Sequence, residues 1–398
     1  MPDAPSAAPG LYLHVPFCSS ICPYCDFSVM HAASPARQSF VARLVAEVAL
    51  AAPTWRDPRP FDTVYFGGGT PSQLHPEELA RVLDACRTHL AFDSPWIFLE
   101  ANPEDVTAEA CAAWRALGVR TLSLGVQSFS DETLRFLGRR HTGRQARAAV
   151  ETALAAGFDT VSIDLIFGLR GQTAEDWRRD LAAAVALAPQ HLSCYQLTIH
   201  EGTRFGVEAK HGRLTELPED EQAMLFEVTH RFLADAGWPA YEVSNFARGP
   251  EHQSRHNRKY WDHTPYLGLG PSAHSLAADA SAPARRWWNA RGTPQWEKKV
   301  AAGERPIEGQ EILGPGEMAA EALLLGLRTT AGIDLDTLRE RYGIDLLAAN
   351  DTLVARLVDE GRFVLRADAD GGRWLVPTVA GLAVADGLAA AFDLSRLN

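Results

Sequence analysis

Apolar, β-branched runs alternate with helical patterns through the first 240 residues. The runs predict strands at 11–15, 63–67, 96–102, 121–127, 160–168 and 191–199. Between them, apolar positions recur at helical spacing in segments rich in Ala, Leu and Arg, at 38–52, 76–90, 110–117, 143–157 and 174–187. Near-continuous apolar strands separated by helices are typical of parallel βα units. Six such units predict an α/β fold, a partial (βα)6 barrel, over residues 1–240.

The pattern changes after residue 240. A polar, aromatic-rich stretch forms a connecting segment over residues 241–310, and a helical pattern begins near Gly316. It continues as helix, helix and two short strands, with Pro377 closing the last strand. We therefore predict a small α+β, winged-helix-like domain over residues 311–398.

Composition and charge narrow the possible classes of protein. A chain of 398 residues that is 46% hydrophobic can bury one large core and a smaller one. Its formal net charge of -12 argues against a surface that seeks nucleic-acid phosphates, so we expect no nucleic-acid partner. The N-terminus lacks a secretory signal, and no apolar run reaches the roughly 20 residues that span a bilayer. We expect a cytoplasmic protein.

Three of the six cysteines crowd together after the first predicted strand. They are Cys18, Cys22 and Cys25, in the run CSSICPYC. Cytosolic thiols stay reduced, so metal ligation explains this spacing better than disulfides, and incidental packing is the alternative. Structural zinc needs four ligands, and the chain has no second C-x-x-C pair. Three thiolates on a four-iron, four-sulfur cluster would leave one iron without a protein ligand.

Polar signatures follow the carboxyl ends of the next predicted strands. They are GGGTP, EANPE and QSF, followed by Asp164 inside the fifth strand. Functional side chains of parallel α/β folds gather at this end, so one composite site is expected. Each signature also has a structural alternative. The glycines alone predict only a turn, Glu100 could pair with an arginine, and a buried Asp164 needs a partner such as Arg139.

The motif C-x-x-x-C-x-x-C, with Tyr24 before its last cysteine, resembles that of the radical S-adenosylmethionine (SAM) superfamily. The runs LYLHVPFCSSICPYCDF, YFGGGTPS, LEANPEDV, LSLGVQSF, FLGRRHT and SIDLIFGL resemble the oxygen-independent coproporphyrinogen III oxidase family, specifically its HemW-type haem chaperone branch. The resemblance covers nearly the whole chain. It implies a [4Fe–4S] cluster on Cys18, Cys22 and Cys25, with SAM on the open iron. It also implies a SAM pocket made of Tyr12, Tyr24, Gly68, Gly69, Thr70, Glu100, Gln127, Arg139 and Asp164.

The two branches of this family differ in function. The oxidase branch carries a further cysteine two residues past the third and a longer N-terminal segment, whereas this chain has Phe27 there and only ten residues before its first strand. The resemblance therefore implies haem as cargo, passed to an acceptor such as a membrane-bound respiratory protein. Coproporphyrinogen III oxidation is the alternative. Whether the chain is an enzyme and whether it forms a homodimer are left open.

The chaperone branch also carries an H-N-x-x-Y-W signature, here His256, Asn257, Tyr260 and Trp261. An imidazole can ligate haem iron, and Tyr and Trp can stack on a porphyrin. The resemblance makes this segment the predicted haem region. A hydrogen-bonded histidine with aromatics that cap the barrel is the alternative. His263, His274 and the run RRWWN at 285–289 lie nearby in sequence and remain further candidates.

Overall fold

One eleven-stranded sheet forms the larger part of the structure, a computed structural model that describes residues 8–31, 34–279, 282–368 and 371–394. Its centre is six parallel strands in chain order: β1 (Gly10–Val15), β4 (Phe61–Gly68), β5 (Phe92–Ala101), β6 (Val119–Gln127), β7 (Thr160–Phe167) and β8 (His191–Gln196). These are the six strands that the sequence predicts. The partial (βα)6 barrel is confirmed.

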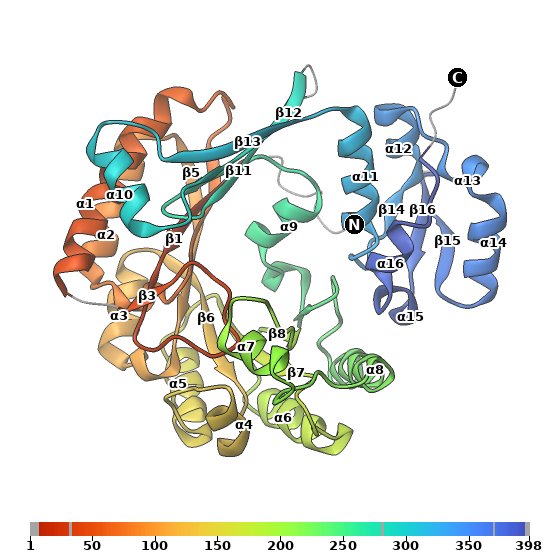
Figure 1. The fold of residues 1–398 in the computed structure, drawn as a ribbon, viewed down its shortest axis with the longest axis horizontal. Coiled ribbons are helices and arrows are strands. Elements are labelled where there is room, and N and C mark those ends of the chain that lie inside the picture. The colour runs from red at the N-terminus through yellow and green to blue at the C-terminus, as the bar shows by residue number, and fades with distance from the viewer. Residues whose placement is uncertain (1–7, 32–33, 280–281, 369–370, 395–398) are drawn as a thin grey trace.

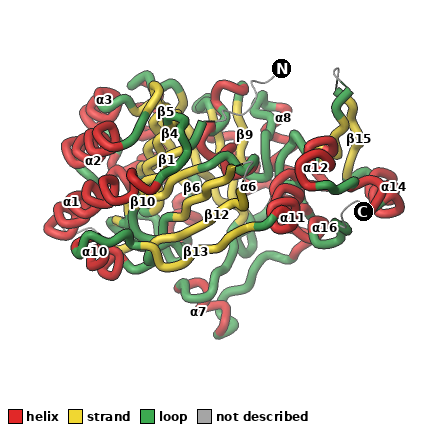
Figure 2. Tube along the Cα trace, turned by 90° about the horizontal axis from the view of Figure 1, so that it is seen from above, coloured by secondary structure: helices red, strands yellow, loops and turns green. Residues whose placement is uncertain are grey.

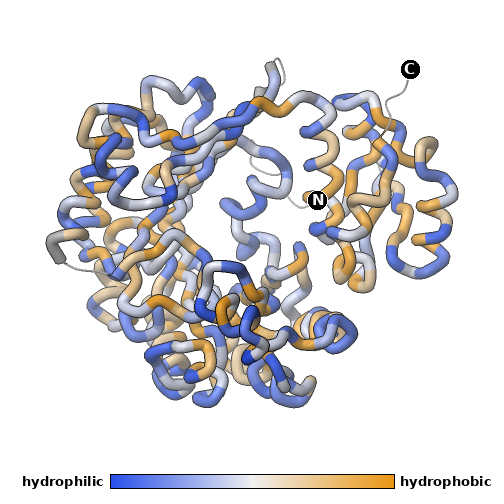
Figure 3. The backbone as a smooth tube through the Cα atoms, viewed as in Figure 1, coloured by the Kyte–Doolittle hydropathy of each residue, from blue (hydrophilic) through white to orange (hydrophobic). Residues whose placement is uncertain are grey.

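Helices cover the outer face of this curved sheet (Figures 1 and 2). The five predicted ones are α1 (Ser34–Ala51), α2 (Pro76–His89), α3 (Ala108–Ala116), α5 (Gly143–Ala155) and α6 (Ala174–Ala186). Thr107, Thr142 and Thr173 start three of them, because each side chain accepts a hydrogen bond from a backbone N–H of the first turn. Polar and apolar residues alternate along the helices in Figure 3, as expected when one face packs on the sheet. The barrel adds the shorter α4 (Asp131–Phe136) and α7 (Arg204–Lys210), and α8 (Glu219–Asp235).

Both edges of the parallel core are extended by later strands. On one edge, β9 (Asn245–Ala247) pairs antiparallel with β8. On the other, β10 (Tyr266–Leu269) lies parallel to β1 and is followed by an antiparallel meander of β11 (His274–Asp279), β12 (Ala282–Asn289) and β13 (Ile307–Leu313). The strands of the segment 241–310 therefore belong to the same sheet as the barrel. The helices α9 (Arg255–Trp261) and α10 (Thr293–Ala301) accompany it. The three-part division of the chain stays a prediction.

The C-terminal segment builds a second core beside the barrel, at the right of Figure 1. Its helices are α11 (Pro315–Gly326), α12 (Leu335–Tyr342), α13 (Leu346–Ala349), α14 (Asp351–Asp359), α15 (Val379–Leu382) and α16 (Ala385–Ala389). Its antiparallel sheet has the order β14 (Ile333–Asp334), β16 (Arg373–Pro377) and β15 (Phe363–Ala367). Buried leucines such as Leu323, Leu338 and Leu375 join helices to sheet. The predicted winged-helix-like domain is confirmed.

Candidate functional site

The three clustered cysteines lie on a loop that leaves and re-enters the barrel rim. Its ends pair as two short parallel strands, β2 (Phe17–Cys18) and β3 (Met30–His31). The turn after β4 supports the loop from below. Gly69 N donates to the carbonyl of Val15 at 2.8 Å, and Thr70 N donates to that of Phe17 at 2.7 Å. The carboxyl ends of β1 and β4 therefore hold the cysteine loop in place.

The glycines of this turn do more than reverse the chain. A Cβ on Gly69 would lie 2.8 Å from two backbone oxygens of the cysteine loop, so only glycine permits this approach. Gly68 has a φ of 107°, which other residues rarely adopt. The sequence left open a turn or a close approach, and the structure shows both.

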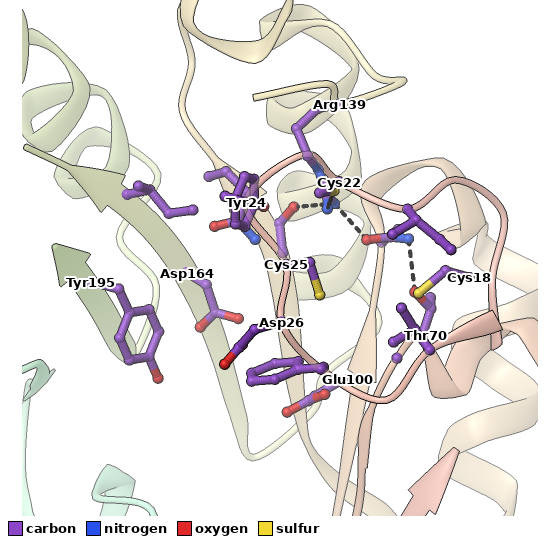
Figure 4. A pocket seen from close by; sticks show the side chains of 18 of the residues that line it. Cys18, Cys22, Tyr24, Cys25, Asp26, Thr70, Glu100, Arg139, Asp164 and Tyr195 are labelled. Atoms are coloured by element: carbon purple, nitrogen blue, oxygen red, sulfur yellow. Dashed lines mark hydrogen bonds between the residues drawn. The ribbon is translucent and has the colours of Figure 1, made fainter. Parts of the chain in front are cut away.

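One cavity of about 410 Å³ opens under the cysteine loop (Figure 4). Eleven predicted site residues line it: Cys18, Cys22, Tyr24, Cys25, Gly68, Gly69, Thr70, Glu100, Gln127, Arg139 and Asp164. They come from the loop and from the ends of β4, β5, β6 and β7, together with the segment after α4. The volume falls within the roughly 300–1,000 Å³ usual for pockets that take a small molecule or cofactor. The composite site expected at the strand ends therefore exists as one space.

Arg139 provides the positive charge beside the thiols. Its Nη1 donates to Cys22 Sγ at 3.4 Å, and its Nη2 donates to the carbonyl of Gly125 at 2.8 Å and to Asn102 Oδ1. Burial raises the pKa of the Cys25 thiol to about 11 and also raises that of Cys18. The Arg139 charge opposes this rise in the pKa of Cys18, and metal binding requires the thiolate form.

Asn102 links this guanidinium to the glycine turn. Its Nδ2 donates to Thr70 Oγ1 at 3.2 Å, and Thr70 Oγ1 lies 3.5 Å from Cys18 Sγ. The sequence analysis did not single out Asn102, although it stands in the EANPE run at a strand end. Tyr195, at the end of β8, also lines the cavity and was also missed. Its place at a strand end was the available signal.

Two carboxyl groups face the cavity without the ion pairs considered for them. Glu100 accepts from Tyr65 OH at 2.7 Å and from Gly68 N at 3.1 Å. Asp164 accepts from Ser123 Oγ at 3.3 Å, and the described residues place no arginine or lysine in ion-pair contact with either group. Burial raises the pKa of Glu100 to about 7 and that of Asp164 to about 6. The oxygens of each carboxyl group can accept further hydrogen bonds, and the hydroxyl or amino groups of a ligand would be suitable donors.

Gln127 ends β6 with a φ of 66°, in the left-handed region. This conformation has a steric cost for a glutamine, and such residues cluster at functional sites when the surroundings hold them in place. The side chain lines the cavity beside Gly125. Its contact with SAM stays a prediction.

Tyr12 lies outside the cysteine cavity and lines a neighbouring one of about 640 Å³. The two cavities adjoin, since Asp26, Phe27, Gly68 and Glu100 line both. The Tyr12 hydroxyl contacts His14 Nδ1 at 3.2 Å. Its predicted contact with SAM stays a prediction.

The H-N-x-x-Y-W segment forms α9 and plugs the opposite end of the barrel. His256 is 0% exposed; its Nδ1 contacts Thr63 Oγ1 at 2.9 Å, and its Nε2 contacts Tyr260 OH at 3.0 Å. Gly10 begins β1 and Thr63, its partner in β4, lies two residues after the start of that strand, so His256 sits near the amino ends of the strands, away from the cysteine loop. The structure therefore shows the hydrogen-bonded alternative for this histidine.

The other three residues of the H-N-x-x-Y-W segment do not line one common cavity. Tyr260 lines the 640 Å³ cavity, Asn257 lines a small space inside the barrel, and Trp261 lines neither of these nor the cysteine cavity. Burial lowers the pKa of His256 to about 3, so its ring stays neutral. The contact of these residues with haem remains a prediction that the geometry does not test.

The donor set of the cysteine cavity fits an iron–sulfur cluster. Three soft thiols and one guanidinium face it, and Cys86, Cys111 and Cys194 are buried elsewhere. Within the described ranges, no three His, Cys, Asp or Glu side chains are grouped to hold a single metal ion. Nor does any helix there have the length and apolar character needed to cross a membrane.

Comparison with known proteins extends this assignment to the whole chain. The sequence matches the Radical SAM superfamily over residues 12–184 and the HemN C-terminal domain over residues 313–374. It is 38% identical over 372 residues to the Heme chaperone HemW of Mycobacterium tuberculosis, covering 90% of this chain and 93% of that one. It is 31% identical over 352 residues to the Heme chaperone HemW of Bacillus subtilis, covering 88% and 91%.

The fold has a solved counterpart in coproporphyrinogen III oxidase (HemN) from Escherichia coli. The two structures agree with a TM-score of 0.80 at 22% sequence identity, over 97% of this chain and 90% of that one. This likeness shows the fold alone. The superfamily uses a [4Fe–4S] cluster and SAM, which are therefore the cofactors of this chain. The chain belongs to the HemW haem chaperone family of the radical SAM superfamily.

Proposed function

We propose that this protein binds haem and delivers it to acceptor proteins in the cytoplasm, and that a [4Fe–4S] cluster and SAM occupy the cavity under its cysteine loop. One observation carries the proposal: 38% identity to a relative named Heme chaperone HemW, over 90% of this chain and 93% of the relative. That name states the role of the relative and does not by itself assign a role to this chain. The agreement over nearly the full length of both chains supports the same role here.

Cys18, Cys22 and Cys25 are the proposed cluster ligands. A reduced cluster held by these thiolates would supply the electron for cleavage of the SAM sulfonium. Arg139 and Thr70 hold the thiols that they contact, and Asn102 joins the two. Glu100 and Asp164 are proposed to accept hydrogen bonds from the SAM ribose and amino groups. Gly68 and Gly69 let the backbone approach the ligand closely.

Coproporphyrinogen III oxidation is the second candidate, favoured by the whole-chain likeness to the HemN fold. Phe27 argues against it. This side chain is 63% exposed and lines both cavities at the position where the resemblance places a further cysteine in the oxidase branch. A phenyl ring cannot replace the thiol that the oxidase branch has at this position. We therefore favour haem transfer over coproporphyrinogen III oxidation as the function of this chain.

Two finer points are tested separately: the resemblance implies a membrane-bound respiratory protein as the acceptor, and we propose that the chain forms a homodimer. Cross-linking of the haem-loaded protein to isolated membranes tests the first. Sedimentation of protein with and without its cluster tests the second, and a single monomeric species in both states would contradict it.

One anaerobic experiment separates the two candidate functions. Protein with a reconstituted cluster is given SAM, a reductant and coproporphyrinogen III, and the porphyrin products are followed by mass spectrometry. Haem is titrated into a parallel sample. Stoichiometric haem binding without decarboxylated product supports the chaperone. Accumulating decarboxylated product would make the protein an oxidase and overturn the proposal.

A further inference from the structure

The 640 Å³ cavity beside the cysteine cavity has no role in the cluster and SAM site described above, apart from Tyr12 and the shared rim. Its lining residues come mainly from β1, from α9 and from the strands β10 to β13 that extend the sheet. Its ring-bearing walls are Tyr12, His14, Tyr260, Tyr266, His274 and Trp288. Its volume is within the roughly 300–1,000 Å³ of pockets that bury cofactor-sized ligands. Phe27, on the shared rim, adds a further exposed ring.

The rings are held in fixed orientations. Tyr260 and Tyr266 meet edge to face with centroids 4.8 Å apart, and His274 stacks on Trp288 at 5.8 Å and 24°. Trp288 rests on Gly309 of the next strand, where a Cβ would come within 2.3 Å of the indole. Flat rings with polar edges are suited to a large planar ligand.

The two histidines of this cavity differ in the hydrogen bonds that their ring nitrogens form. His14 Nδ1 contacts Tyr12 OH, and His14 Nε2 contacts the Ser28 carbonyl at 2.9 Å, so both nitrogens are engaged. The His274 ring is exposed and makes no hydrogen bond or ion pair within the described residues. Burial, and then the Arg286 guanidinium, lower the pKa of His274, so its imidazole is neutral with a lone pair available at pH 7.

His256 compares poorly as an iron ligand. Both of its nitrogens are hydrogen-bonded, it is fully buried, and it lies at the closed end of the barrel. Ligation would require breaking one of those hydrogen bonds and opening the barrel plug. His274 needs neither change.

The cavity also carries one cationic side chain among its described lining residues, Arg291. Its Nη2 donates to the Asp26 carbonyl at 2.9 Å, and no described carboxylate forms an ion pair with its guanidinium. Glu308 Oε2 accepts a hydrogen bond from Arg291 N at 3.2 Å, and the carboxylates of Asp26 and Glu100 also line the cavity, so Arg291 is the cation among these acidic groups. An anionic group on a ligand would therefore be directed toward Arg291.

We propose that haem binds in this second cavity with His274 as an axial iron ligand and Arg291 as the partner of a propionate. The inference rests on the proposed function, since it takes haem as the cargo. The H-N-x-x-Y-W segment then acts indirectly, because His256 holds Tyr260 and Tyr260 forms one wall of the haem cavity.

The test is a haem titration of the full-length, cluster-containing protein, followed by its visible spectrum and by electron paramagnetic resonance of the ferric haem. His274→Ala should raise the dissociation constant for haem about tenfold or more and remove the histidine-ligated spectrum. Adding free imidazole to His274→Gly should restore that spectrum. Arg291→Ala should weaken binding several-fold and leave the ligand spectrum unchanged. His89→Ala, on the exposed end of α2, is the matched control.

Unchanged affinity and spectrum in His274→Ala would overturn the inference while haem binding by the unsubstituted chain still supports the proposed function. Failure of the unsubstituted chain to bind haem would overturn the proposed function, and the inference with it. Circular dichroism and cluster content show whether each variant is folded. Loss of the histidine-ligated spectrum in folded His256→Asn, with His274 intact, would also count against the inference.

Discussion

Arg139 Nη1 lies 3.4 Å from Cys22 Sγ, and the same guanidinium donates to the Gly125 carbonyl in β6. One side chain therefore fastens the cysteine loop to the sheet and brings a positive charge to the thiols. We expect Arg139→Ala to lower the iron and sulfide content per chain and to weaken SAM binding about tenfold or more. Arg140→Ala is the control. Equal cluster content and SAM affinity in both variants would contradict this role.

Cys22→Ser should abolish the visible absorption of the cluster, because an alcohol replaces one of three thiolate ligands. Cys86→Ala is the comparison, since Cys86 is buried on α2 and lines neither the cysteine cavity nor the 640 Å³ cavity. Absorption is measured after anaerobic reconstitution with iron and sulfide. Full absorption in Cys22→Ser would remove it from the ligand set.

Tyr65→Phe tests the role of Glu100. The Tyr65 hydroxyl donates to Glu100 Oε1 at 2.7 Å, and only Gly68 N otherwise donates to this carboxylate among the described residues. Without the hydroxyl the carboxylate loses one of two contacts that orient it, so we expect SAM affinity to fall several-fold with the cluster content unchanged. Isothermal titration with SAM measures this. An unaltered affinity would place Glu100 outside the SAM contacts.

The sequence predicted the architecture well because its signal is local. Six apolar runs gave six strands, and the polar residues at their carboxyl ends meet because parallel strands place those ends together. The hydrogen-bonded, buried environment of His256 could not be predicted from the sequence. Nothing in H-N-x-x-Y-W says whether the histidine faces a ligand or the barrel interior, and its partner Thr63 lies 193 residues away. Asn102 was missed for a related reason, because its role depends on hydrogen bonds to Arg139 and Thr70, which are neighbours in space and distant in sequence.

Gln127 should show a conflict between stability and binding. Its φ of 66° is strained for glutamine, so Gln127→Gly should raise the free energy of unfolding by up to about 1 kcal/mol while weakening SAM binding. Ser94→Gly is the matched control, because Ser94 has a φ of 44° at an exposed position outside both cavities. It should gain similar stability with no effect on SAM. Equal SAM affinity in the two variants would contradict a binding role for Gln127.

Glu47 predicts a pH dependence of stability far from the cluster site. Its side chain is 1% exposed, and it accepts from Gly270 N at 2.8 Å, Asn289 Nδ2 at 2.6 Å and Trp296 Nε1 at 2.9 Å. It thereby ties α1 to the turn after β10, to the end of β12 and to α10. Burial outweighs these three donors and raises its pKa from 4.5 to about 7.

The sign follows from proton linkage. Between pH 4.5 and about 7 the folded chain keeps the Glu47 proton that the unfolded chain has released, so the contribution of this group to stability falls as pH rises through that window. Relative to Glu47→Gln, which does not titrate, the unsubstituted chain should lose about 2–3 kcal/mol of unfolding free energy between pH 5 and pH 8. Urea unfolding at four pH values measures the difference. Glu109→Gln, at an exposed position with a lowered pKa, should give a flat difference over the same range, and an equally flat result for Glu47→Gln would show that Glu47 is ionised throughout.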